Sequence, residues 1–319
     1  MTEISQLEKI TTQVRRDILR MVHGAQSGHP GGPLGCAELL TALYFRVLHH
    51  DPANFTMDGE GEDLFFLSNG HLSAGWYSVL ARSGYFDKKE LSTFRLIDSR
   101  LQGHPATEEG LPGVRVASGS LGQGLSVALG AALTKKLNDD PQLVYCLMGD
   151  GEQQEGQIWE AALFGAGRKV DNIIGIVDYN GQQIDGAVDD VMPLGDLKAK
   201  WEAFGWQVLE MNGNTMSEVL DTLEKAKSMC GQKQPVVILM HTEMGYGVDF
   251  MMGTHEWHGK PPFEDIALCI ANKPAFSYIS MFEHQLLYLL NLTSCLVTAE
   301  YFINKIDSIC REEFFHCSA

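Results

Sequence analysis

Residues 149–185 read GDGEQQEGQIWEAALFGAGRKVDNIIGIVDYNGQQID. This stretch follows one apolar run of the chain and contains a second. The runs are LVYCLM at 143–148, directly before this stretch, and NIIGIV at 172–177, within it. Both runs are typical of buried strands, and the segment between them is typical of a helix. A strand, a helix and a second strand in this order predict two parallel strands whose carboxyl ends lie at one edge of a sheet.

Polar residues follow both predicted strands at the point where each strand ends. Asp150 follows the first strand and Asn180 follows the second. In open α/β sheets the carboxyl edge is where ligands bind, and carboxylate and amide oxygens suit Mg²⁺ or Ca²⁺. Magnesium commonly keeps positions for ligand phosphates, and Gly149 and Gly151 would let the backbone approach such an anion closely. The stretch therefore predicts a magnesium–diphosphate site.

The rest of the chain continues the alternation of strands and helices. We expect a doubly wound, mainly parallel α/β sheet with helices on both faces over residues 1–273, followed by a helical tail over 274–319. Residues 25–33 are expected to form a rigid glycine-rich loop. Further strands are expected at 64–67, 206–211 and 236–240, and helices at 4–23, 36–48, after 72, 88–98, from 124 onward, 195–204 and 216–230.

The composition excludes several classes of protein. The chain has 319 residues, 45% of them apolar and 20% charged, which is ordinary for a globular protein. A net charge of −17 argues against nucleic acid or an anionic membrane as a partner. The seven cysteines form no Cys-x-x-Cys pair, so we expect reduced thiols. The N-terminus lacks the apolar core of a signal peptide, so we expect a cytoplasmic protein.

Four histidines stand in glycine-rich turns at predicted strand or helix ends. They are His29 in SGHPGG, His71 in SNGHLS, His104 in QGHPA and His258 in WHGK. The segment SGSLGQGLS, residues 118–126, opens another predicted helix, whose unpaired first amides are expected to offer an anion or heterocycle site.

The sequence resembles the transketolase family over residues 5–270. Gly-Asp-Gly followed after twenty-eight residues by Asn is similar to the thiamine-diphosphate fingerprint of these enzymes. The resemblance implies the thiamine-diphosphate-binding fold, thiamine diphosphate and Mg²⁺ as cofactors, and the diphosphate beside Gly149 and Gly151. It implies Asp150 and Asn180 as side-chain ligands of Mg²⁺ and Gln182 as a backbone-carbonyl ligand.

The same resemblance implies roles for the remaining motifs. His29, His71, His104 and His258 would line the substrate channel and assist proton transfer, with His71 and His258 also binding the cofactor. His255 lies in the same loop as His258, and we favour His258. The resemblance implies further cofactor contacts at Ser120, Leu121 and Gly122. It also implies Glu155 as a carboxylate that relays between paired active sites.

The resemblance is greatest to the N-terminal subunit of a split transketolase. Single-chain members commonly have Pro where Ser120 stands, and the tail after 273 has no counterpart. The implied reaction transfers a two-carbon ketol unit between sugar phosphates, in the manner of the pentose phosphate pathway. It requires self-association into a heterotetramer that contains a separate pyrimidine-binding C-terminal subunit, and the chain alone is expected to be inactive.

Alternative functions stay open at this point. The nearest are a subunit similar to deoxyxylulose-phosphate synthase and a transketolase for a modified sugar. A third is a subunit that binds the cofactor without turnover. A magnesium–nucleotide binder has little support, because no Walker sequence or Gly-x-Gly-x-x-Gly stands at a strand end.

Overall fold

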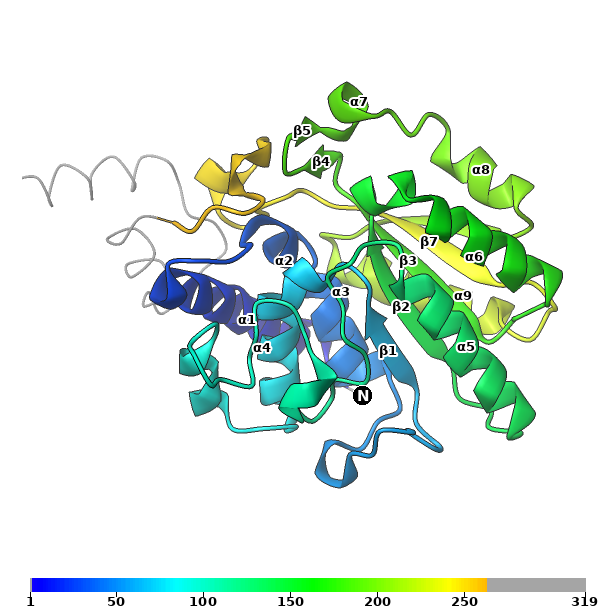
Figure 1. Ribbon diagram of the computed structural model, residues 1–319, viewed down its shortest axis with the longest axis horizontal. Coiled ribbons are helices and arrows are strands. Elements are labelled where there is room, and N and C mark those ends of the chain that lie inside the picture. The colour runs from blue at the N-terminus through cyan, green and yellow to red at the C-terminus, as the bar shows by residue number, and fades with distance from the viewer. Residues whose placement is uncertain (1, 263–319) are drawn as a thin grey trace, which may run out of the picture.

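Five parallel strands form the centre of this computed structural model, which describes residues 2–262 (Figure 1). Their order across the sheet is β1-β2-β3-β7-β6, and every neighbouring pair is parallel. The predicted α/β sheet is therefore confirmed within the described residues, whereas the expected tail at 274–319 lies outside them. The strands are β1 (Leu64–Leu67), β2 (Val144–Gly149), β3 (Ile173–Tyr179), β6 (Gln207–Asn212) and β7 (Val236–His241).

Helices cover both faces of the sheet (Figure 1). Successive side chains of a strand point to opposite faces, so Tyr145 and Leu147 enter one apolar cluster while Cys146 and Met148 enter the other. No helix among the described residues is long and apolar enough to cross a membrane. The first face carries α1 (Ile4–Ala25), α3 (Ala37–Ala42), α4 (Ser73–Ser83) and α9 (Met216–Met229), and the second carries α5 (Gly124–Leu137), α6 (Gly156–Gly167) and α8 (Leu197–Ala203).

Two short elements follow β3 that the sequence did not predict. Strands β4 (Gln182–Gln183) and β5 (Gly186–Ala187) form a small antiparallel hairpin, and α7 (Val188–Val191) follows it directly. Ladders of two residues are too short to leave a periodic pattern in the sequence. The hairpin matters because it places residues 182–184 beside the end of β2.

The predicted loop at 25–33 is partly wrong, because Ala25 ends α1 and residues 31–33 are helical. The helix α2 (Gly31–Gly35) is fully buried against the segment that follows β7. A Cβ atom on Gly31 would lie 2.6 Å from Cγ of Met244, and one on Gly35 would lie 2.9 Å from the carbonyl oxygen of Glu243. These glycines serve close packing, and this packing holds the loop of His258 near the loop of His29.

The predicted helix at 88–98 is also wrong. Only a 3₁₀ turn, Lys88–Thr93, forms there. Ser92 Oγ donates to the carbonyl of Lys89 and Thr93 Oγ1 donates to that of Glu90, both at 2.8 Å. Hydroxyls that bond the nearby backbone compete with helix continuation, and Arg95 then has a φ of 59°. The predicted helix at 36–48 is present, but α3 continues as a π-helical turn over Leu43–Val47.

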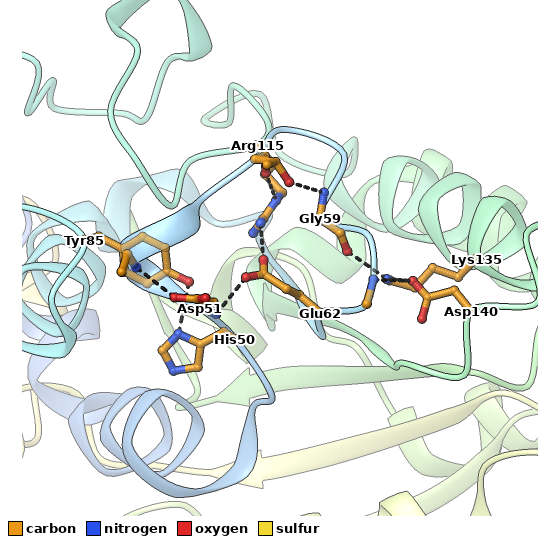
Figure 2. A network of polar contacts seen from close by, with 11 residues as sticks. His50, Asp51, Gly59, Glu62, Tyr85, Arg115, Lys135 and Asp140 are labelled. Carbon is orange, nitrogen blue, oxygen red and sulfur yellow. Dashed lines mark hydrogen bonds and ion pairs between the residues drawn. The ribbon is translucent and has the colours of Figure 1, made fainter.

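A buried polar network lies at the amino-terminal end of the sheet, next to the start of β1 (Figure 2). Arg115 Nη2 lies 2.5 Å from Oε2 of Glu62, whose other oxygen accepts the amide of Asp51 at 2.7 Å. Lys135 Nζ donates to Asp140 at 2.7 Å and to the carbonyl of Gly59 at 3.2 Å. Every charge has a partner in this network, so its role is to hold residues 50–63 and the end of α5 in place.

A matched pair of helical glycines tests the packing of α2. Gly35→Ala should lower the free energy of unfolding by about 1–3 kcal/mol, because the new methyl group meets the backbone of Glu243. Gly130→Ala, at an exposed position of α5 with no atom within 4 Å, should raise it by about 0.5–1 kcal/mol through helix propensity. Urea unfolding measures both, and equal effects would contradict the packing role.

Candidate active site

A cavity of about 350 Å³ opens at the carboxyl edge of the sheet. Its walls come from the ends of β1, β2 and β3 and from the loops that carry the four histidines. Almost all of the site residues predicted from the sequence meet here. Those that line the cavity are His29, His71, His104, Leu121, Gly149, Asp150, Gly151, Glu155, Asn180, Gln182 and His258.

A larger cavity of about 460 Å³ lies elsewhere, beside α1 and the Lys88–Thr93 turn. It holds no residue of the predicted motifs. Its one acid, Asp17, already accepts hydrogen bonds from Arg82 and Ser78 at 2.6 and 2.8 Å. The chemistry therefore lies in the smaller cavity at the strand ends.

Asp150 and Asn180 join the ends of β2 and β3. Asp150 is 2% exposed, and its two oxygens accept the amides of Gly151 and Gly181 at 2.7 and 2.6 Å. Asn180 Nδ2 donates to Asp178 at 2.9 Å, and Asn180 Oδ1 accepts the amide of Gln182 at 2.9 Å. Carboxylate and amide oxygens have more than one lone pair, so each can also coordinate a cation.

The electrostatics of this corner suit a cation. Burial, together with the neighbouring Asp178, raises the pKa of Asp150 to about 7. A bound cation would favour the charged form and offset that burial. The described residues contain no cluster of three or more His, Cys, Asp or Glu that could hold a metal. A cation here would thus use one carboxylate, amide and carbonyl oxygens, and phosphate oxygens of a ligand, a donor set that fits Mg²⁺.

The four predicted histidines form one cluster on the other side of the cavity. The ring centroid of His29 lies 5.3 Å from that of His71, 5.7 Å from that of His258 and 6.0 Å from that of His104. His71 and His258 are 5.0 Å apart. Segments far apart in the sequence converge here, as the resemblance to the transketolase family implied.

Burial keeps this cluster uncharged near neutral pH. It lowers the pKa of His29 to about 4, with His258, Arg95 and His104 adding to the shift, and it lowers the pKa of His71 well below the usual range. It also lowers the pKa values of His104 and His258. A neutral imidazole offers one donor and one acceptor, which suits sugar hydroxyls and proton exchange. Within the described part of the chain, Nδ1 of His29 and Nδ1 of His258 have no hydrogen-bond partner.

The start of α5 differs from its prediction. Glu152, which is 1% exposed, accepts the amide of Gly122 at 2.8 Å and that of Gly149 at 2.9 Å, and Ser68 Oγ donates to it as well. Ser68 Oγ also accepts the amide of Gly124 at 3.1 Å. The amides of Gly122 and Gly124 are therefore not open to an anion as expected, because protein side chains already bind them.

The predicted cofactor loop is split by this arrangement. Gly119 and Leu121 line the main cavity. Ser120 is exposed and borders a separate pocket of about 210 Å³, and Gly122 is buried behind the wall. Glu155 lies at the cavity edge with its side chain exposed. His258 lines the cavity, whereas its loop neighbour His255 does not, which favours His258 as predicted.

Several cavity residues were missed by the sequence analysis. Each lies within a segment that was quoted for a neighbouring residue, so proximity to a motif was the available signal. Polar side chains of this kind are common in turns, and only the fold shows which of them face the cavity. The missed residues are Asn69, Gly119, Glu152, Gln154, Asp178, Gln183 and Ile184.

Residues 7–278 match the family model described as "Transketolase, thiamine diphosphate binding domain". The chain belongs to this family. It is 41% identical over 261 residues to one of the subunits of the apulose-4-phosphate transketolase of Actinobacillus succinogenes, an alignment covering 82% of this chain and 92% of that protein. It is 39% identical over 254 residues to "6-deoxy-6-sulfo-D-fructose transketolase subunit SqwG" of Clostridium sp., covering 79% and 90%.

Solved transketolases share the fold. The transketolase from Campylobacter jejuni matches with a TM-score of 0.77 and 34% identity. The match covers 85% of this chain and 42% of that one, so the chain spans less than half the length of the solved transketolase. The predicted family and the predicted thiamine-diphosphate-binding fold are therefore confirmed.

The low pKa of His29 predicts a loss of stability in acid. Its pKa is about 4 in the folded chain against an ordinary value of 6.5, so between these values only the unfolded chain binds the proton. The free energy of unfolding should fall as the pH drops from 6.5 to 4. In His29→Gln the slope of this fall with pH should be smaller by the contribution of about one bound proton. Urea unfolding across this range measures the slope.

Unfolding at pH 8 supplies the reference for that comparison, because His29 is neutral there in both the folded and the unfolded chain. At that pH the variant changes the free energy of unfolding only through packing. Parallel pH profiles for the two proteins would contradict the assignment.

Proposed function

We propose that the chain is the thiamine-diphosphate-binding subunit of a two-chain transketolase that transfers a two-carbon ketol unit between sugar phosphates. One observation carries this proposal: Asp150 and Asn180 stand at the ends of adjacent strands, in the same cavity as four clustered histidines with lowered pKa values. The first part suits a magnesium diphosphate and the second suits a polyhydroxylated substrate.

The described residues fit the phosphate end of thiamine diphosphate. Asp150, Asn180 and the carbonyl of Gln182 would hold Mg²⁺, with Gly149 and Gly151 beside the diphosphate. His71 and His258 would add contacts, as would the loop of Ser120, Leu121 and Gly122 through atoms other than the Gly122 amide. When bound, the cofactor supplies the electron sink that ketol transfer requires.

The histidines perform the part of the chemistry that belongs to this chain. His29, His71, His104 and His258 would hold the sugar hydroxyls and move protons to and from them. Lowered pKa values keep these rings neutral near neutral pH, so each offers one hydrogen-bond donor and one acceptor and can take up a proton from a hydroxyl and then return it. Glu155, exposed at the edge of the cavity, would relay between paired sites across the boundary with a neighbouring chain.

A second chain completes the proposed enzyme. Both relatives described above are named as subunits of a transketolase, and this chain covers at least 90% of each. By analogy, a pyrimidine-binding subunit would grip the other end of the cofactor, and two such pairs would form a heterotetramer with Mg²⁺ in each site. We place the enzyme in the cytoplasm, with phosphorylated sugars of the pentose phosphate type as substrates.

A modified sugar is the second candidate substrate. The names of both relatives specify unusual sugars, apulose 4-phosphate in one and 6-deoxy-6-sulfo-D-fructose in the other. Product analysis with phosphorylated pentoses and with these two sugars separates the alternatives.

Replacement of Asp150 tests the metal site. Asp150→Ala removes a direct magnesium ligand and should weaken Mg²⁺-dependent binding of thiamine diphosphate about 100-fold or more, since even outer partners of metal ligands contribute 10- to 100-fold. Calorimetry of the complex with its partner chain measures this affinity. Asp189→Ala, an exposed acid on α7, is the control and should bind normally. Unchanged binding by Asp150→Ala would refute the site.

Reconstitution tests the need for a second chain. The purified chain alone should show no ketol transfer with thiamine diphosphate, Mg²⁺, a ketose phosphate donor and an aldose phosphate acceptor, because the described residues form only one wall of the proposed site. Addition of a pyrimidine-binding subunit should restore ketol transfer. The release of the aldose phosphate that remains of the donor measures the reaction. Robust turnover by the chain alone would overturn the two-chain proposal.

A further inference from the structure

Asn69 is a buried amide that the protein itself leaves without hydrogen bonds. It follows β1 directly, lines the cavity and is 1% exposed. Among the described residues, neither its Oδ1 nor its Nδ2 has a hydrogen-bond partner. Most buried side-chain polar groups in proteins are bonded, and one left unpaired destabilises the fold.

The surrounding backbone holds Asn69 in this position. The carbonyl of Asn69 accepts the amide of Leu72 at 2.9 Å, and the amide of Gly70 donates to the carbonyl of Ser68, also at 2.9 Å. Ser68 is tied by its hydroxyl to Glu152. A Cβ atom on Gly70 would lie only 2.7 Å from the backbone of Ser118. Neighbouring residues thus fix the turn, and the Asn69 amide contributes nothing to holding it.

The amide faces the part of the cavity where the phosphate end of a ligand would lie. A Cβ atom on Gly149 would be 3.9 Å from Asn69 Nδ2, so the amide stands beside the Gly-Asp-Gly turn. The same turn presents Asp150, and His71 follows two residues after Asn69. A diphosphate anchored at Asp150 through a cation would bring anionic oxygens to this amide.

We propose that Asn69 is an additional ligand-binding residue, whose amide donates a hydrogen bond to a phosphate oxygen of the cofactor. This inference rests on the proposed function. It explains why a buried amide is retained without a partner in the protein: the ligand supplies the partner. Exchanging the two amide atoms leaves the argument unchanged, since both lack partners and either orientation offers one donor.

If Asn69 has this role, its replacement should raise the stability of the ligand-free chain and lower its affinity for the ligand. Asn69→Leu replaces the amide by an apolar side chain of similar shape, so the ligand-free chain should unfold at a higher urea concentration than wild type. The same variant should bind magnesium thiamine diphosphate about 10- to 100-fold more weakly, the range for a hydrogen bond to a charged group. A residue with a purely structural role would lose stability instead.

Asn214 is the matched control for the stability measurement. It lies just beyond β6, and its amide is fully used: Nδ2 donates to the carbonyl of Gly35 and Oδ1 accepts the amide of Glu243, both at 2.8 Å. Asn214→Leu should therefore unfold at a lower urea concentration. If Asn69→Leu also does so, Asn69 is a structural residue and the proposal is wrong.

Calorimetry with two probes completes the test. Wild type, Asn69→Leu, Asn69→Ala and Asn69→Asp are titrated with magnesium thiamine diphosphate and with magnesium pyrophosphate, each in complex with the partner chain. Both probes should weaken in all three variants, and most in Asn69→Asp, which puts a negative charge next to the phosphate. Asn69→Ala keeps the test valid if the leucine variant does not fold.

The outcomes separate this proposal from the one beneath it. If wild type binds neither probe, the proposed function fails. If wild type binds and the Asn69 variants bind equally well, the proposed function stands and the role of Asn69 is refuted.

Discussion

The buried carboxylate of Glu152 is the interaction on which the geometry of the site depends. It binds the amide of Gly149 at the end of β2, the amide of Gly122 before α5 and the hydroxyl of Ser68 after β1. A buried charge is tolerated only when donors surround it, so the convergence of these segments stabilises the buried carboxylate. Although burial raises its pKa, these three hydrogen bonds favour the charged form. The fold and the site therefore depend on the same contact.

The cavity beside Glu152 differs, because several of its buried polar groups lack such partners. Its groups are buried without full compensation: Asp150 has a raised pKa, His29 a lowered one, and Asn69 has no hydrogen-bond partner among the described residues. The burial of Asp150 and Asn69 destabilises the ligand-free chain near neutral pH and would be relieved by a cation or a phosphate oxygen, whereas the burial of His29 destabilises it only in acid. Such local conflicts are expected at functional sites, while the network around Arg115 and Glu62, where every charge is paired, is purely structural.

The sequence predicted the features that depend on local pattern. Apolar runs located the five strands of the sheet, and the Gly-Asp-Gly turn with Asn180 located the cavity at its carboxyl edge. Features that depend on contacts between distant segments were missed. Nothing local in GGPLG at 31–35 shows that its glycines pack against residues 243–257, and nothing in SGSLGQG shows that Glu152 binds the amide of Gly122.

The chemical character of the cavity wall supports the proposed second chain. Among the residues that line the cavity in the described part of the chain, only Leu121 and Ile184 have apolar side chains, and Ile184 is 61% exposed. Sites for ring-containing ligands are usually lined mainly by apolar and aromatic groups. This wall instead supplies carboxylates, amides and imidazoles, which suit phosphate, metal and hydroxyl groups. In the proposed two-chain enzyme the partner would supply the surface that covers the rings of thiamine diphosphate, and it would meet this chain at the exposed Glu155 on the cavity edge.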